Sequence, residues 1–456
     1  MLFSWAFCTN RIVIIKSGGQ EMKKLISLLV TAAMCVSMVA CGGTSQPDSN
    51  ASNGDGGAGE TKITLWTYPV GKFGDETTVK GFIENFNKVH PEIKVNVEFL
   101  SYKDGDNQVT AALEAGTAPD IILEGPERLV SNWGAKGKMV DISDLWTDTK
   151  SDIDAQSHAI AAACNKDGVY YEYPFCMTTH CMAINYDVFE KAGALQYLDL
   201  ESRTWTTENF VKAMEAVKKS GLVQETGVVY CGGQGGDQGT RALVTNLYSA
   251  QFTNPEHTKY VIDEENGIKG LELIKEMVDK GTLSHDAGIQ AAEELQLFAN
   301  GTAAVSFCWN AANEANYASQ VSFKPYAMAF PSDDGKPELA GGIWGFGIFD
   351  NGDQARIDAS KEFIKFICDD ETQGKESVKA TGFFPVKASY GNVYAGTEDE
   401  ERMEGYTAMM AYLGDYYNVA PNWAEQRTAW WNMLQSIFSG TSVKDAAAKY
   451  VSEVNK

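Results

Sequence analysis

The chain has 456 residues, and its 38 basic and 61 acidic side chains give it a formal net charge of −23 at pH 7. A surface this acidic repels nucleic acid and anionic lipid, which argues against both as partners. Single hydrophobic cores stop growing near ~250–300 residues, so we expect two lobes. Only one apolar run approaches the ~20 residues that a membrane helix needs, and it lies near the N-terminus.

That run belongs to residues 22–41 (MKKLISLLVTAAMCVSMVAC), which have the order of a secretory signal. Two lysines precede the apolar stretch, and small residues end it. The ending MVACG resembles the bacterial lipobox, whose cysteine is acylated and becomes the first residue of the mature protein. We therefore predict a lipoprotein signal peptide over residues 22–40 and a lipid on Cys41. The lipid would hold the protein on the extracellular face of a Gram-positive-type cell membrane. A buried apolar helix is the alternative.

The segments on either side of the signal have separate interpretations. Residues 1–21 precede a complete signal peptide, and Gly18-Gly19 can be encoded by a ribosome-binding sequence. We expect them to be an over-extended gene start, with translation beginning at Met22. Residues 41–60 consist mostly of Gly, Ser, Asn, Asp and Ala, so we expect a flexible tether there.

The first part of the body alternates between strand and helix patterns. Alternating or wholly apolar runs predict strands at residues 62–68, 93–100 and 119–123. Apolar residues at helical spacing predict helices at residues 79–90, 107–115 and 128–136. Strands and helices in this order form a parallel sheet with helices on both faces, so the predicted fold class is α/β.

The rest of the body mixes β-rich and helical segments. Strands are predicted within residues 168–185, where Pro174 interrupts the pattern, and at 228–230, 303–309, 326–331 and 341–349. Helices are predicted at 186–192, 204–220, 241–249, 267–280 and 293–300, followed by a helical C-terminal region at 355–369, 372–380, 400–413, 425–439 and 443–454. The body cysteines stand mostly in apolar contexts, and we expect buried free thiols rather than disulfides.

The ordered set of segments resembles the extracellular solute-binding lipoproteins of ABC importers, within the carbohydrate-binding group related to maltose-binding protein. The resemblance covers nearly the whole mature chain and is carried by ITLWTY, FNKVHPEIKV, AGTAPDIILEGP, GKMVDISDL, GVYYEYPF, INYDVFEKAG, TWTTENFVKAMEAVKKSG, FANGTAAVSFCWN, GGIWGFGIF, FIKFICDDETQ and ATGFFPV. Two segments depart from it. HCMAIN replaces the usual aromatic-rich crossing strand, and CGGQGGDQGT matches the family least. Both concern the expected cleft, so they bear on the identity of the ligand.

The resemblance implies two α/β lobes joined by a hinge of crossing strands. Residues 61–173 with 326–352 would form the first lobe, and residues 174–325 with 353–456 the second. The ligand would bind between the lobes, which would close around it.

The implied function is the capture of a carbohydrate, with an oligosaccharide as first choice, and its delivery to ABC permease subunits in the membrane. The protein would act as a monomer, without a cofactor and without catalysing a reaction. A polyamine, a peptide or a glycerol phosphodiester in the same fold is the alternative ligand. A secreted glycosidase needs only two carboxylates ~5–10 Å apart, but no nucleophile elbow or zinc motif is visible. A sensor that passes the binding signal to a kinase is also compatible with the sequence.

A sugar site needs aromatic faces for the C–H surfaces and carboxylate or amide groups for the hydroxyls. The candidates chosen by this rule stand mostly where strands end or helices begin, and they are Tyr68, Glu124, Asp237, Arg241, Trp309, Asn310, Trp344 and Trp423. Trp309 with Asn310 matches the family's strand-end aromatic and is the first choice. The alternative roles are core packing for Trp344 and helix capping for Glu124.

Other ligand classes are disfavoured by spacing. The glycine-rich CGGQGGDQGT lacks the spacing of a phosphate-binding loop, so we reject nucleotide binding. Cys176, His180 and Cys181 alternate between the faces of a strand and cannot all converge on a metal ion. The segment that begins at Asp104 resembles part of a calcium loop but lacks its later bidentate glutamate. We therefore predict no metal site.

Overall fold

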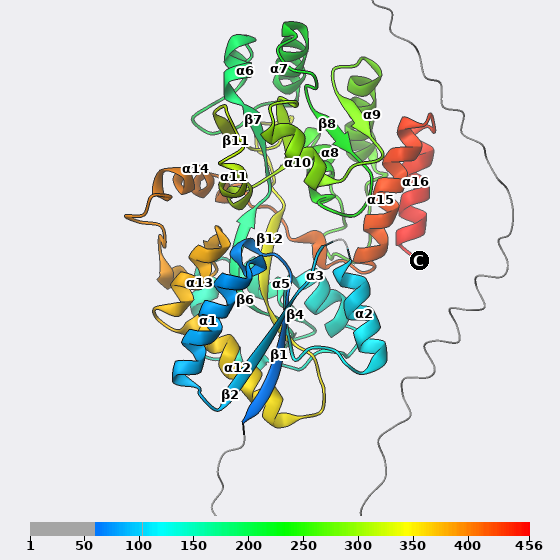
Figure 1. The fold of residues 1–456 in the computed structure, drawn as a ribbon. Helices are drawn as coiled ribbons and strands as arrows, with labels where there is room; N and C mark the ends of the chain where they lie inside the picture. The colour runs from blue at the N-terminus through cyan, green and yellow to red at the C-terminus, as the bar shows by residue number, and fades with distance from the viewer. Residues whose placement is uncertain (1–59, 103) are drawn as a thin grey trace, which may run out of the picture. The chain divides into compact units, whose positions relative to one another are not determined.

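The computed structural model describes residues 60–102 and 104–456, and Figure 1 shows their fold. The predicted gene-start segment 1–21, the signal peptide 22–40, the lipidated Cys41 and all but the last residue of the 41–60 tether lie outside the described residues. Among the helices that the structure describes, none is both long and apolar enough to cross a membrane.

The larger sheet has six strands in the order β13-β6-β12-β3-β1-β2. These strands are β1 (Thr61–Thr67), β2 (Ile93–Phe99), β3 (Ile121–Glu124), β6 (Tyr173–Thr179), β12 (Gly341–Ile348) and β13 (Phe384–Pro385). β1 pairs in parallel with β2 and β3, and the connections run through the helices α1 (Glu76–Val89) and α2 (Gly105–Ala115). β12 is antiparallel to both β3 and β6. The α/β class and the parallel pairing predicted from the sequence are confirmed.

A smaller antiparallel sheet has the order β10-β7-β11, and it consists of β7 (Cys181–Asn185), β10 (Val305–Trp309) and β11 (Pro325–Met328). β6 of the larger sheet ends one residue before His180 and β7 begins one residue after it, so a single segment passes from one sheet into the other (Figure 1). The backbone N–H of His180 donates to the carbonyl of Ala340, just before β12, at 2.9 Å. Two-stranded pairs are formed by β4 (Asn165–Lys166) with β5 (Val169–Tyr170), and by β8 (Val228–Tyr230) with β9 (Ser284–Asp286).

Most of the predicted helices are found with small shifts of their ends. They are α6 (Tyr186–Lys191), α7 (Thr207–Ser220), α8 (Gln238–Leu247), α9 (Glu265–Asp279), α10 (Ala291–Ala299), α12 (Gln354–Asp369), α13 (Gln373–Thr381), α14 (Glu400–Met410), α15 (Trp423–Phe438) and α16 (Val443–Val454). Three short helices were not predicted, namely α4 (Lys150–Gln156), α5 (His158–Ala163) and α11 (Ala311–Tyr317).

The helix predicted over residues 128–136 has a different form. The short α3 (Pro126–Arg128) is followed by a π-helical turn, Leu129–Gly134. The backbone N–H of Ala135 donates to the carbonyl of Val130, five residues back, at 2.9 Å. Such wide turns are frequent at functional sites. The turn directly follows Arg128, a residue of the cavity described below.

The expectation for the cysteines is confirmed. Within the described residues all of them are buried free thiols, and they are Cys164, Cys176, Cys181, Cys231, Cys308 and Cys368.

A buried carboxyl group joins helix α10 to strand β10. Glu294 is fully buried, and its two carboxyl oxygens accept hydrogen bonds from the backbone N–H of Phe307 at 2.7 Å and from the hydroxyl of Ser306 at 2.8 Å. Burial raises the pKa of Glu294 from 4.5 to about 8, although both hydrogen bonds oppose that shift. The folded protein therefore holds this carboxyl protonated at neutral pH.

This group makes stability depend on pH in a defined direction. Between about pH 4.5 and 8 the unfolded chain has lost this proton while the folded chain keeps it, so the free energy of unfolding falls as pH rises. We predict that Glu294→Gln, whose amide oxygen can accept from Phe307 and whose amide nitrogen can donate to the hydroxyl of Ser306, removes this component, on the order of 5 kcal/mol across the window. Denaturant unfolding of both proteins from pH 4.5 to 8.5 measures the difference. Parallel pH profiles would contradict the assignment.

Candidate functional site

A cavity of about 420 Å³ opens at the carboxyl end of β3, beside the start of β12 and the His180 junction. Its wall combines side chains from both sheets and from α15, and the groups used below are Tyr102, Glu124, Arg128, His180, Arg241, Cys308, Asn310, Trp344, Trp423 and Arg427. Ligands of open α/β sheets bind outside the carboxyl ends of the strands. This position makes the cavity the candidate binding site.

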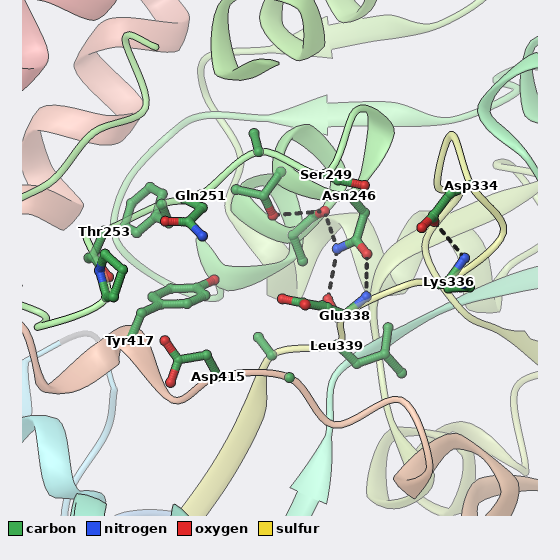
Figure 2. A pocket seen from close by; sticks show the side chains of 17 residues that line it. Asn246, Ser249, Gln251, Thr253, Asp334, Lys336, Glu338, Leu339, Asp415 and Tyr417 are labelled. Atoms are coloured by element: carbon green, nitrogen blue, oxygen red, sulfur yellow. Dashed lines mark hydrogen bonds between the residues drawn. The ribbon is translucent and has the colours of Figure 1, made fainter. Parts of the chain in front are cut away.

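A second cavity, of about 590 Å³, lies among loops next to the C-terminal end of α8 (Figure 2). The amide of Asn246 in its wall is already engaged, because it donates to the carbonyl of Glu338 and accepts from the backbone N–H of the same residue, both at 2.8 Å (Figure 2). The backbone N–H of Lys336 similarly donates to the carboxylate of Asp334 at 2.8 Å. The two bonds of Asn246 hold the end of α8 to the segment at Glu338, and the bond of Lys336 closes a turn within one loop. These groups are already engaged, and we therefore keep the smaller cavity as the candidate binding site.

Five of the eight predicted site residues line the smaller cavity: Glu124, Arg241, Asn310, Trp344 and Trp423. The other three, Tyr68, Asp237 and Trp309, lie behind its wall, where each contacts a residue of the wall.

Tyr68 is fully buried, and its hydroxyl donates to the carboxylate of Asp106 at 2.7 Å. Its ring stacks against Tyr102, with the ring centroids 5.2 Å apart. Tyr102 is 42 % exposed and lines the cavity in its place. Tyr102 follows strand β2 at its carboxyl end, so the rule that selected Tyr68 applies to Tyr102 as well.

Trp309 is also fully buried, and its indole N–H donates to the hydroxyl of Tyr406 at 2.7 Å. Its neighbours Cys308 and Asn310 line the cavity. Successive side chains of a strand point to opposite faces. The indole of Trp309 therefore points into the core and offers no face to a ligand in this cavity.

Asn310 caps helix α11, because its side-chain carbonyl accepts from the backbone N–H of Asn313 at 2.9 Å. The side-chain amide of Asn313 in turn donates to the carbonyl of Cys308 at 3.0 Å. These bonds fix two amide groups at the cavity wall, where both residues are found.

Asp237 is a shared counter-ion for two arginines. Its carboxylate accepts from Nε of Arg241 at 2.9 Å and from Nε of Arg427 at 2.8 Å. All three side chains are buried, and both arginines line the cavity. Arg241 also donates to the side-chain carbonyl of Asn418 at 3.1 Å. Asp237 therefore positions the two guanidinium groups and does not face the ligand.

Glu124 holds another buried arginine. One of its carboxylate oxygens accepts from Nη1 of Arg128, and the other accepts from the backbone N–H of Gly125 at 2.8 Å. Arg128 also donates to both carboxylate oxygens of Asp106, at 2.6 and 3.1 Å. The carboxylate of Glu124 is thus engaged inside the protein with Arg128 and Gly125, and it does not cap helix α3, whose N-cap is Gly125 without a side-chain cap.

Trp344 is a half-exposed aromatic plate. Its indole stacks on Phe383, with ring centroids 4.8 Å apart and an interplanar angle of 11°. The ring also lies over Gly342, where an added Cβ would approach its carbon atoms to 2.1 Å. Only glycine fits there, which explains the spacing GGIWG. The ring is thereby held flat while it lines the cavity.

His180 was considered in the sequence only as a metal ligand, yet it lines the cavity beside Trp344, with their ring centroids 6.2 Å apart. Its Nδ1 has no hydrogen-bond partner among the described residues. Burial, and secondarily the charge of Arg241, lower its pKa to about 4. His180 is therefore a neutral hydrogen-bonding group at physiological pH.

Known proteins share both the sequence pattern and the fold. The family model described as bacterial extracellular solute-binding protein matches residues 81–404. The chain is 23% identical over 450 residues to the diacetylchitobiose binding protein DasA of Streptomyces coelicolor, and the match covers 95% of this chain and 98% of that protein.

Among solved structures, the GacH receptor of Streptomyces glaucescens, determined without ligand and with acarbose, has a TM-score of 0.69 at 16% identity and covers 86% of this chain and 97% of its own. Lmo0181 of Listeria monocytogenes, in complex with cycloalternan, has a TM-score of 0.69 at 17% identity, covering 87% and 98%. The maltose-bound MalE3 of T. maritima has a TM-score of 0.65 at 18% identity, covering 86% and 99%. These likenesses establish the fold.

The family model spans most of the chain, from the first helix to α14, and the fold agrees with it. The protein belongs to the bacterial extracellular solute-binding protein family.

Proposed function

We propose that this protein captures a carbohydrate, with an oligosaccharide as first choice, in the 420 Å³ cavity and delivers it to an ABC permease. The two lobes predicted from the sequence close around the ligand, and the closed form docks on the permease. ATP is hydrolysed by another subunit. The acylated Cys41 tethers the protein to the outer face of the membrane.

The observation that carries this proposal is a flat aromatic plate surrounded by neutral amides. Trp344 offers a surface for the C–H face of a sugar ring. The amide side chains that line the same cavity are Gln238, Gln290, Asn310, Asn313, Asn316 and Asn418. Amides both donate and accept, which suits hydroxyl groups that do the same.

The charged groups of the cavity disfavour the alternative ligands. A polyamine needs unpaired carboxylates, but Glu124 is paired with Arg128, and Asp237 is paired with two arginines. The other two carboxylates of the wall, Glu127 and Glu293, have no cationic partner, but they already accept hydrogen bonds from Tyr416 and from the backbone N–H of Gln290. A glycerol phosphodiester needs unpaired cations, but each of these arginines already has a carboxylate partner. A neutral ligand leaves these buried pairs intact, and breaking a buried pair is strongly destabilising.

The ligands named for the relatives support a carbohydrate as well. DasA is named for diacetylchitobiose, and the structures of GacH and Lmo0181 contain acarbose and cycloalternan. These relatives are binding proteins rather than enzymes, and we extend that role to this chain.

The ligand class is tested by a thermal-shift screen of the purified protein against diacetylchitobiose, maltotriose, monosaccharides, spermidine, tripeptides and a glycerol phosphodiester. A ligand at a hundred times its Kd adds about 2.7 kcal/mol to stability, which raises Tm by a few degrees. We expect a saccharide to produce this shift without being converted. A shift from spermidine or a peptide alone would replace the ligand class and leave the family assignment intact.

The role of Trp344 as a stacking surface for the saccharide is tested by the substitution Trp344→Ala. Loss of the stacking surface should weaken saccharide binding at least tenfold, or about 1.4 kcal/mol. Trp66→Ala is the matched control, because Trp66 is also a half-buried tryptophan of the larger sheet but lies outside the cavity wall. Calorimetric titration of both variants measures the change. Equal affinities for the two variants would refute the role of Trp344.

A further inference from the structure

Trp423, at the first position of α15, is covered by two arginines. The guanidinium carbon of Arg128 lies 4.8 Å from the ring centroid, and that of Arg427 lies 4.3 Å from it. The side chain is only 7% exposed. With two guanidinium groups this close to the ring and so little of the side chain exposed, the indole offers little surface for a sugar to stack on.

The two arginines are themselves fixed by carboxylates. Arg128 is held by Glu124 and Asp106, and Arg427 is held by Asp237. These partners come from β3, α2 and the residue that precedes α8. The indole is therefore held between elements that are distant in the sequence. Its orientation does not depend on the ligand.

The edge of the same indole carries an unused donor. Nε1 of Trp423 is buried and has no hydrogen-bond partner among the described residues, although the side chain lines the cavity. An indole nitrogen can only donate. A buried donor without a partner is unfavourable, so a ligand that brings an acceptor relieves it.

We infer that Trp423 recognises the ligand edge-on, by donating its Nε1–H to a neutral oxygen acceptor, and that it is not a stacking plate. The acceptor is a hydroxyl, a ring or glycosidic oxygen, or an amide carbonyl. A ligand ammonium group cannot serve here, because it carries only donors and has no lone pair to accept from an indole N–H. The inference rests on the proposed function and specifies how one end of the saccharide is recognised.

The experiment compares Trp423→Phe with wild type by calorimetric titration of diacetylchitobiose and maltotriose. Phenylalanine keeps an aromatic ring beside the guanidinium groups, and it removes the N–H donor together with part of the indole, a loss of size that the control variant below shares. We expect binding to weaken about fivefold to tenfold, as for the loss of one hydrogen bond. Trp430→Phe is the matched control on the same helix, because its indole N–H donates to Thr240 at 2.9 Å and it lies outside the cavity wall. It should lower Tm and leave affinity unchanged.

A second readout uses the wild-type protein, so it does not depend on whether the variant folds. The assigned indole ¹H–¹⁵N resonance of Trp423 should shift on saturation with the saccharide, because the N–H gains an acceptor. Unchanged affinity in folded Trp423→Phe, or an unmoved resonance in the saturated protein, would overturn the inference alone. Failure of the wild type to bind any saccharide would overturn the proposed function and this inference with it.

Discussion

The structure around the cavity depends on a buried network of two charge clusters, one around Arg128 and one around Asp237, which meet at the ring of Trp423. Arg128, Arg241 and Arg427 are balanced by Glu124 and Asp237, together with Asp106 at the edge of the network. Pairs of this kind add little net stability compared with an apolar core, but removing one partner leaves an uncompensated buried charge. The network instead fixes the relative positions of the elements that form the cavity wall. It ties the end of β3 to α8 and α15 and holds Trp423 in one orientation.

This network also determines what the cavity can accept. Its arginines and Glu124 are ion-paired. Glu127 and Glu293 also line it, and they accept hydrogen bonds from the hydroxyl of Tyr416 and from the backbone N–H of Gln290. The cavity also offers neutral hydrogen-bonding groups. His180 stays uncharged near neutral pH because burial lowers its pKa to about 4. Asn310 and Asn313 are amides fixed by bonds to the backbone. A neutral molecule rich in hydroxyl groups suits such a cavity better than an ion does.

The fold could be predicted from local patterns because most of its elements show them. β1 buries every second residue, from Ile63 to Thr67, and β3 buries all four of its residues, as the alternating and apolar runs indicated. The π-helical turn after Arg128 was missed because its buried apolar residues Leu129, Val130 and Trp133 have the spacing of an ordinary helix, which does not reveal the hydrogen-bonding pattern. Helix α11 was missed because it buries only Ala311 and Ala312 and its sequence AANEANY shows no apolar periodicity.

The site could be predicted only in part, for two physical reasons. Composition indicates that a strand end carries an aromatic residue, but not which of two successive side chains faces the cavity, so Trp309 was chosen where Cys308 and Asn310 line it. The network is also invisible to local patterns, since Arg427 and Asp237 are 190 positions apart. The role of Arg427 therefore emerged only from the structure, as did the places of Arg128 and His180 in the cavity wall.

The most direct test of this account is a crystal structure of the protein with diacetylchitobiose, or with maltotriose if that sugar gives the larger thermal shift. We expect a sugar ring in contact with the indole of Trp344, with an oxygen within hydrogen-bond distance of Nε1 of Trp423. A sugar in the loop cavity of Figure 2, with the 420 Å³ cavity unchanged, would contradict it.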